Sequence, residues 1–347
     1  MMIIEISPQN MKLLGRTFFR DGLTYLSYSG SSVEFEFTGK KLGAWIVSEY
    51  VFSEEECWIG LLVDGVFEKR ICLKEGKHYY SLMEENKTQK RRICLMKLTE
   101  VQYASCALEA LETEEGALCI PVSEKRERIV FLGDSITCGF GVEGDAEAPF
   151  STKDENVLLS YGMLCAEKLF MEPELVCFSG IGLVSRYVEP EEEEPRQDVL
   201  IEHLYQVSDW YLTRRKGWER DERWKFEEHP ARIVVINLGT NDASWIRRKP
   251  EREKYFQERY VYFLKTVRDS HPKAKLICVL GTIDDSLCSA MERAVEQYRA
   301  QTGDREVFAL RQEKQGADEK TGSQGHPNKE RHEKMAEQLT AFIKELG

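Results

Sequence analysis

The second half of the chain contains five short apolar runs separated by longer stretches, and this pattern constrains the fold more than any other feature. The runs are rich in Val, Ile and Leu and occupy residues 129–132, 175–178, 233–238, 276–280 and 307–310. Such runs are typical of parallel strands that are buried on both faces. The stretches with a helical pattern between them are residues 156–170, 251–270 and 287–301. This alternation predicts an α/β fold with a doubly wound, five-stranded parallel sheet, which binds ligands beyond the carboxyl ends of its strands.

The first half of the chain has a different period. Residues 33–38 alternate apolar and polar side chains, which is typical of a half-buried strand. Residues 58–63 and 66–73 flank the pair Asp64-Gly65, which suits a tight hairpin turn. Many short strands separated by turn residues predict a β-sandwich.

The length of 347 residues suggests two domains. The β pattern ends near residue 121, and a charged connector at residues 123–128 leads into the α/β pattern. We therefore expect an N-terminal β domain at residues 1–124 and a second domain at residues 125–347.

Composition excludes several classes of protein. The net charge of −12 argues against nucleic acid and anionic membranes as partners, since both attract basic surfaces. The first residues lack the basic start and continuous apolar stretch of a secretory signal, and no apolar run approaches the roughly 20 residues of a membrane span. The ten cysteines include no C-x-x-C pair, so we expect reduced core cysteines, no metal and a cytoplasmic protein.

Polar residues that can do chemistry follow the apolar runs, at the edge where such a sheet places its active site. The segments are Gly133-Asp134-Ser135, Ser179-Gly180, Gly239-Thr240-Asn241-Asp242 and, after the last run and its loop, Gly325-His326-Pro327. Each is weak evidence by itself, because a Gly-Asp-Ser tripeptide can be an ordinary turn at the end of a strand. Four such segments in this order indicate one active site.

These segments resemble those of the SGNH or GDSL-type hydrolases, which are named for four blocks that hold Ser, Gly, Asn and His. The resemblance spans the second domain and implies that Ser135 is the nucleophile and His326 the base. It also implies that Gly180 and Asn241 belong to the oxyanion hole. No cofactor is expected.

The residue types suit these roles. A serine hydroxyl becomes a good nucleophile when an adjacent imidazole takes its proton. Attack on an ester carbonyl creates an oxyanion, and the backbone N–H groups of Ser135 and Gly180 and the side-chain amide of Asn241 are its expected donors.

Six histidines compete for the role of base. His229 and His271 each precede a proline shortly before an expected strand, which places them at the wrong edge of the sheet. His332 shares an apolar helical stripe, so a structural role is the better interpretation. His326 lies just ahead of that helix and is the strongest candidate.

One departure concerns the third member of a catalytic triad. Many of these hydrolases have an Asp three residues before the His, where this chain has Ser323. A carboxylate normally orients the imidazole and stabilises its charged form. We expect a Ser135–His326 dyad in which a backbone carbonyl or, less readily, Ser323 itself holds the other ring nitrogen.

The N-terminal half resembles the jelly-roll module of carbohydrate esterase family 2. The segment that matches this module is residues 28–39 (YSGSSVEFEFTG), and the resemblance to the family continues in the second domain at residues 159–162 (LSYG) and 224–226 (WKF). Members of that family remove acetyl groups from plant polysaccharides such as xylan and mannan, and several use a dyad without the acid. The resemblance therefore implies an acetyl esterase whose substrates are acetylated manno- or xylo-oligosaccharides, which the sequence does not separate.

Aromatic rings near the mouth of such a site suit sugars, whose C–H faces stack on flat rings. Trp245 is the leading platform, and Trp224 is a second candidate that could equally be a core aromatic. Asp242 either binds a sugar hydroxyl or caps the segment that follows it.

Two alternative functions stay open. The same scaffold serves lipid and thioester hydrolases, although no amphipathic lid is evident here. A non-catalytic carbohydrate-binding protein would use the β domain to hold glycans and would have no need of a nucleophile and a base.

Overall fold

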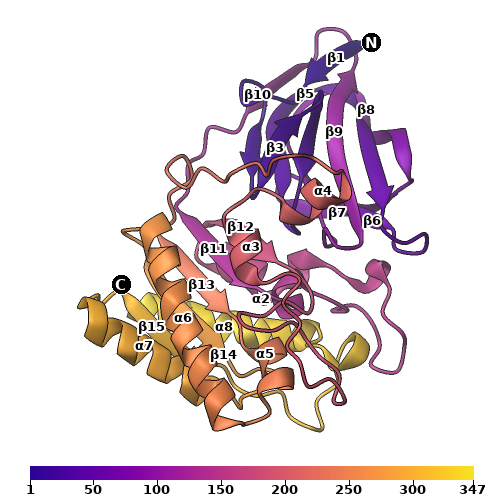
Figure 1. The fold of residues 1–347 in the computed structure, drawn as a ribbon. Helices are drawn as coiled ribbons and strands as arrows, with labels where there is room; N and C mark the ends of the chain where they lie inside the picture. The colour runs from indigo at the N-terminus through magenta and orange to yellow at the C-terminus, as the bar shows by residue number, and fades with distance from the viewer.

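The structure is a computed structural model that describes all residues from 1 to 347, and it contains two sheets. The N-terminal strands form the upper part of the molecule in Figure 1, and the parallel sheet with its helices forms the lower part. Strand β10 (Leu118–Pro121) is the last of the first sheet, and β11 (Arg128–Gly133) is the first along the chain of the second. The change from the antiparallel sheet to the parallel sheet therefore lies in the charged connector at residues 123–128.

The N-terminal sheet is antiparallel. Its other strands are β1 (Met2–Glu5), β2 (Lys12–Leu14), β3 (Thr17–Arg20), β4 (Leu23–Leu26), β5 (Ser32–Tyr50), β6 (Cys57–Val63), β7 (Val66–Leu73), β8 (Gly76–Lys97) and β9 (Ala104–Thr113). The order along the main path is β3-β4-β9-β5-β8-β6-β7. The long strands β5 and β8 change register at bulges, which bend the sheet around a core of apolar side chains. The expected β domain is confirmed, and its jelly-roll connectivity stays a prediction.

The alternation along β5 follows from the burial of one face. Val33, Phe35 and Phe37 are fully buried in the core of this sheet. The β6–β7 hairpin closes at Asp64 and Gly65, which have φ angles of +54° and +82°. Both values belong to the left-handed region that this pair tolerates in tight hairpins.

The parallel sheet has the five strands that the apolar runs predicted. The further strands are β12 (Glu172–Cys177), β13 (Ile233–Asn237), β14 (Lys275–Leu280) and β15 (Val307–Arg311), in the order β12-β11-β13-β14-β15. Every neighbouring pair is parallel. All carboxyl ends of the strands consequently meet at one edge of the sheet.

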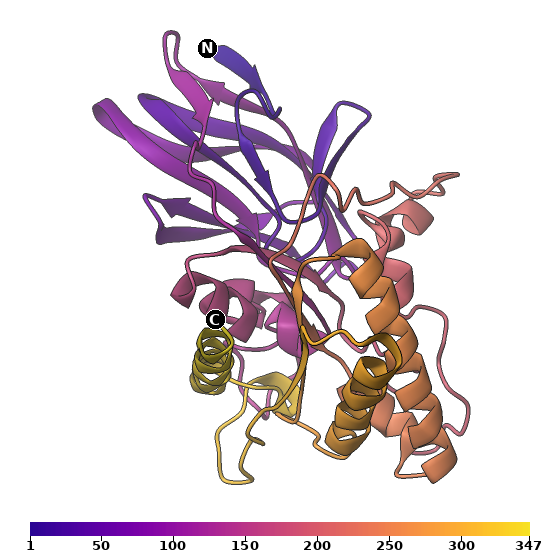
Figure 2. The ribbon, with the colours of Figure 1, turned by 90° about the vertical axis from the view of Figure 1, so that its left-hand side faces the viewer.

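Helices cover both faces of this sheet, as Figure 2 shows. On one side lie α2 (Tyr161–Lys168) and α8 (Lys329–Glu345), and on the other α6 (Pro250–Ser270) and α7 (Cys288–Thr302). The shorter helices are α1 (Ser135–Cys138), α3 (Ile201–Tyr205), α4 (Trp210–Arg215) and α5 (Thr240–Ile246), with 3-10 turns at Thr152–Asp154, Val157–Leu159 and Ser323–Gly325.

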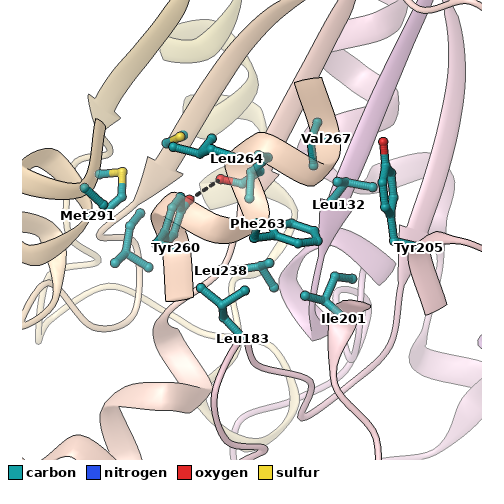
Figure 3. Packing of buried hydrophobic residues seen from close by; sticks show 14 of the residues in the cluster. Leu132, Leu183, Ile201, Tyr205, Leu238, Tyr260, Phe263, Leu264, Val267 and Met291 are labelled. Carbon is teal, nitrogen blue, oxygen red and sulfur yellow. Dashed lines mark hydrogen bonds between the residues drawn. The ribbon is translucent and has the colours of Figure 1, made fainter. Parts of the chain in front are cut away.

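Alternate residues of each parallel strand enter different cores. Val130 and Leu132 of β11 pack with α6 and α7, whereas Ile129 and Phe131 pack with α2 and α8. Figure 3 shows part of the first core, where the Tyr260 hydroxyl lies 3.5 Å from the carbonyl oxygen of Ile236. Burial on both faces explains why these strands read as continuous apolar runs rather than alternating ones.

The two domains are joined by buried charged side chains, of which Arg16 of the N-terminal domain is the clearest. It is fully buried, and its Nε lies 3.1 Å from Oε1 of Glu174 on β12. Its Nη1 donates to the carbonyls of Leu204, Tyr205 and Val207 at 3.2, 2.5 and 2.7 Å. The guanidinium therefore fastens the N-terminal sheet to the segment around α3.

Two further findings bear on the sequence expectations. No helix is long and apolar enough to cross a membrane. All ten cysteines are free, and most of them are buried.

Replacing Arg16 tests whether this junction stabilises the whole chain. In Arg16→Ala we expect a loss of about 3–5 kcal/mol in the free energy of unfolding, because Glu174 and three carbonyls are left buried without their donor. Arg293→Ala removes an exposed ion pair to Glu253 and should cost at most about 1 kcal/mol. Urea unfolding of both variants makes the measurement, and equal small losses would contradict the prediction.

Candidate active site

Ser135 lies at the turn between strand β11 and helix α1, at the carboxyl edge of the parallel sheet. Asp134 caps the helix, since its Oδ1 accepts the Ile136 N–H at 3.0 Å. Ser135 is the first residue of α1, so its own N–H is one that the helix cannot use. Only 6% of the serine is exposed. The turn thus presents a hydroxyl and a free donor at the same place.

His326 lies beside this serine, although 191 residues separate them in the chain. Its Nε2 lies 2.8 Å from Oγ of Ser135. The histidine follows the 3-10 turn Ser323–Gly325, and its carbonyl accepts the Gly322 N–H at 2.8 Å. Asn328, two residues later, caps α8. The expected nucleophile and base are therefore in hydrogen-bond contact.

The surroundings of His326 favour the neutral ring. Burial lowers the pKa of His326 to about 4, and the backbone carbonyls of Ser323 and Gln324 oppose that shift. The Nδ1 atom has no hydrogen-bond partner, and neither has the Ser323 hydroxyl. Ser323 is fully buried against Gly141, whose carbonyl accepts its N–H at 3.0 Å. The Ser323 hydroxyl therefore does not hold the ring, and a backbone carbonyl as the partner of Nδ1 stays a prediction.

Hydrogen bonds of Asn241 link the turn that carries Ser135 to the segment that follows Gly180. The Asn241 amide Nδ2 donates to Asp134 Oδ2 at 3.1 Å and to the Ile181 carbonyl at 2.8 Å. Gly180, immediately before Ile181, has a φ of +78°, and its N–H has no acceptor in the protein. A glycine suits this backbone, which other residues rarely adopt. The free N–H of Gly180 is available to a ligand, whereas Asn241 would have to release a partner.

Asp134 braces this arrangement through both carboxylate oxygens, one toward Ile136 and one toward Asn241. It is fully buried, and burial raises its pKa to about 7. The carboxyl group touches neither Ser135 Oγ nor His326 in any hydrogen bond. Asp134 therefore supports the turn that carries Ser135.

Asp242 does not lie where a sugar could reach it, and the expectation of substrate binding is wrong for this residue. It is fully buried, and its Oδ1 accepts the N–H groups of Leu183, Val184 and Ser185 at 2.9, 2.7 and 3.0 Å. A carboxylate beside three backbone donors is satisfied inside the protein. Asp242 holds the loop that follows Gly180.

Trp224 is a core aromatic at the domain junction, so its expected role at the mouth is also wrong. It is 7% exposed, and its ring stacks on His229 with centroids 4.2 Å apart. The guanidinium of Arg16 lies 5.0 Å from the ring centroid. The indole therefore covers the buried Arg16.

Trp245 on α5 is half-buried, and protein groups engage it. Its indole N–H donates to the Glu193 carbonyl at 2.9 Å, and the Arg252 guanidinium lies 4.5 Å from the ring centroid. These contacts anchor the acidic loop around Glu193. A sugar-stacking role for Trp245 stays a prediction.

Sequence reasoning missed the aromatic rings that do lie beside His326. Phe140 lies 4.4 Å from the imidazole centroid and stacks on Phe150 at 3.7 Å. Tyr103, from the N-terminal domain, follows at 5.2 Å from Phe150. Nothing in the sequence pairs Tyr103 with a loop 47 positions later, so only the docking of the domains reveals this row of rings.

His332 has the structural place expected of it. It is fully buried, and its Nδ1 accepts the Tyr161 N–H at 3.1 Å. The apolar helical stripe therefore predicted the burial of His332 correctly, and the role of His326 as the base stays a prediction.

Comparison with family models identifies both parts of the chain. Residues 13–122 match the model described as the carbohydrate esterase 2 N-terminal domain. Residues 129–339 match the GDSL-like lipase/acylhydrolase model.

Two curated relatives are similar in sequence to nearly all of this chain, across both of its domains. The cellulase/esterase CelE of Acetivibrio thermocellus is 29% identical over 323 residues, which are 92% of this chain. This chain spans only 37% of CelE. An acetylxylan esterase / glucomannan deacetylase of Cellvibrio japonicus is 26% identical, over 99% of this chain and 90% of its own length.

Solved structures also resemble this chain over nearly its whole length. A family two carbohydrate esterase from Clostridium thermocellum, in complex with cellohexaose, superposes with a TM-score of 0.84 at 27% identity, covering 97% of this chain and 98% of that one. The acetyl xylan esterase Est2A from the rumen bacterium Butyrivibrio proteoclasticus shares the fold, with a TM-score of 0.88 at 20% identity over 99% of this chain and 98% of its own. The chain therefore belongs to the GDSL-like lipase/acylhydrolase family, as a carboxylic-ester hydrolase with the N-terminal domain of family 2 carbohydrate esterases.

Proposed function

We propose that this protein is a carbohydrate O-acetyl esterase in which Ser135 and His326 form a catalytic dyad. The observation that carries the proposal is the 2.8 Å contact between Ser135 Oγ and His326 Nε2. A nucleophile and its base need a separation of this kind. The relatives described as acetylxylan esterases and a glucomannan deacetylase support acetylated plant oligosaccharides of the manno or xylo type as substrates.

The reaction proceeds in two halves. Ser135 Oγ attacks the acetyl carbonyl carbon while His326 Nε2 takes the hydroxyl proton. The tetrahedral intermediate then collapses, its C–O bond to the sugar breaks, and Nε2 returns the proton to the leaving sugar oxygen. Water then attacks the carbonyl carbon of the acetyl-enzyme while Nε2 takes a proton from it. The C–O bond to Ser135 Oγ breaks, Nε2 returns the proton to Oγ, and acetic acid leaves and ionises in water.

The oxyanion of each tetrahedral intermediate needs donors that are already in place. The N–H groups of Ser135 and Gly180 supply two of them, and Asn241 supplies a third when its amide turns from Ile181. Removing one such donor typically costs about 10²–10³ in kcat. The imidazolium that forms transiently is stabilised by the carbonyls of Ser323 and Gln324 rather than by a carboxylate.

The leading alternative is a lipid or thioester hydrolase, and acyl chain length separates the two. Wild-type enzyme should hydrolyse 4-nitrophenyl acetate at least about 10 times faster, in kcat/KM, than the butyrate, and should release acetate from acetylated manno- or xylo-oligosaccharides.

Ser135→Ala should lose at least about 10³-fold in kcat, since the nucleophile is gone. The exposed serine variant Ser53→Ala should be unchanged. Preference for longer acyl chains would contradict the proposal, and glycan binding without hydrolysis would favour a binding protein.

The acid limb of the pH profile follows from the pKa of His326. The base works only when neutral, and its pKa of about 4 lies below the ordinary value of 6.5. We therefore expect kcat/KM to stay near its plateau down to about pH 5 and to fall as the pH drops through 4. Tryptophan fluorescence must confirm that the protein is folded at each pH. A limb near pH 6.5 would show that burial does not control this histidine.

Ser323 offers a direct test of the dyad. Because its hydroxyl has no hydrogen-bond partner, Ser323→Ala should keep kcat within about threefold of wild type. His326→Ala should be nearly inactive by the same assay. A loss in Ser323→Ala as large as that in His326→Ala would mean that the hydroxyl orients the base.

A further inference from the structure

Glu100 belongs to the N-terminal domain but is buried in the catalytic domain. It lies between β8 and β9, in the turn that begins after Lys97, and none of its surface is exposed. Its carboxylate forms no ion pair with any Arg, Lys or His. A buried carboxylate is costly unless several donors satisfy it, so its hydrogen bonds indicate what it is used for.

Two of those hydrogen bonds go to Ser179, the residue immediately before Gly180. The Ser179 N–H donates to Glu100 Oε2 at 2.6 Å, and the Ser179 hydroxyl donates to Oε1. The two oxygens of one carboxylate therefore accept hydrogen bonds from the backbone and from the side chain of the same serine. Gln102 Nε2 adds a third donor, at 3.1 Å from Oε2.

These two hydrogen bonds restrain Ser179, whose carbonyl forms the peptide bond that carries the free N–H of Gly180. The direction of that N–H is set by the conformation of Ser179 on one side and the +78° φ of Gly180 on the other. A glycine does not fix its own conformation, so the neighbouring contacts must do so. Glu100 holds the preceding residue, and the Ile181 carbonyl that follows is held by Asn241.

A second buried acidic side chain, that of Glu155, lies beside Glu100 and has fewer hydrogen-bond donors around it. The Glu100 N–H donates to Glu155 Oε2 at 3.3 Å, and Oε1 of Glu155 has no partner. Burial raises the pKa of Glu155 well above its ordinary value. Burial also raises the pKa of Glu100, but the Ser179 hydroxyl and N–H oppose the rise. The carboxylate oxygens of Glu100 therefore accept hydrogen bonds from Ser179 and Gln102, whereas those of Glu155 accept the Glu100 N–H.

We propose that Glu100 is a positioning residue of the oxyanion hole, through which the N-terminal domain fixes the Gly180 N–H by way of Ser179. The inference rests on the proposed function, because Gly180 matters in this way only if an oxyanion forms beside Ser135. It makes the β domain part of the catalytic unit rather than an appended glycan-binding module. Glu100 touches no reacting atom and acts through the loop alone.

The experiment compares two variants of this contact with a matched control. Glu100→Gln keeps the size of the side chain but cannot accept from both Ser179 donors, and Ser179→Ala removes only the hydroxyl donor. Glu174→Gln alters an equally buried carboxylate, which pairs with Arg16 at the domain junction and forms no hydrogen bond to Ser179 or Gly180. We expect kcat for 4-nitrophenyl acetate to fall about 10- to 100-fold in Glu100→Gln and about 3- to 10-fold in Ser179→Ala, with KM within about threefold. These losses are part of the about 10²–10³ that a whole donor is worth.

All rates are divided by the concentration of active sites, titrated with a fluorophosphonate that forms a bond to Ser135 Oγ as fluoride leaves. A merely structural role would lower the melting temperature and the number of titratable sites but not the rate per site. We expect that behaviour only in Glu174→Gln. An unchanged kcat per site in both Glu100→Gln and Ser179→Ala would overturn the proposal. If Glu100→Gln does not fold, Ser179→Ala decides by itself.

A boronic acid inhibitor supplies a readout that does not depend on the ester chosen. Its adduct with Ser135 is tetrahedral and places an oxygen in the oxyanion hole, so its Ki should rise by about the factor by which kcat falls. An unchanged Ki in both variants overturns the positioning role. Wild-type enzyme that binds the boronate but does not hydrolyse acetyl esters would overturn the proposed function instead, so the two failures are distinguishable.

Discussion

The structure depends on charged groups of the N-terminal domain that are buried in its partner domain. Arg16 pairs with Glu174 and ties down the carbonyls around α3, while Glu100 holds Ser179 at the edge where the active site lies. A buried charge that loses its partners costs several kcal/mol. The two domains therefore have one favourable arrangement, and that arrangement places Tyr103 of the first domain next to the rings beside His326. The β domain is a structural component of the site.

Within the catalytic domain, one hydrogen-bond network joins segments that are distant in sequence. Asp134 braces the turn that carries Ser135, Asn241 links Asp134 to Ile181, and Asp242 holds the backbone two residues further on. The network holds the backbone beside Ser135 in place, and Asn241 is the member that would have to release a partner to donate to an oxyanion. The neighbours Asn241 and Asp242 thus bind different segments. Asn241 contacts Asp134 beside Ser135, and Asp242 accepts the N–H groups of residues 183–185.

The chain has a serine at position 323, where a triad would have an acid, and other groups surround His326. Burial keeps His326 neutral, and Phe140 packs against its ring. Because Ser323 is enclosed by the backbone of Gly141, its small side chain lets the two loops approach closely. In the dyad that we propose, packing of the imidazole against Phe140 takes the place of the carboxylate that a triad would use.

The sequence by itself determined the local features of this protein. It located the five parallel strands, because strands buried on both faces need continuous apolar runs. It also predicted that Ser135 and His326 meet, because the loops at one sheet edge must converge. It could not place Asp242 or Trp224, since a carboxylate and an indole serve equally well at a surface or inside, and only burial distinguishes the two. The tertiary structure alone decided that Trp224 covers Arg16 and that Glu100 reaches Ser179. Those contacts join residues far apart in the chain through the docking of two domains, which no local pattern encodes.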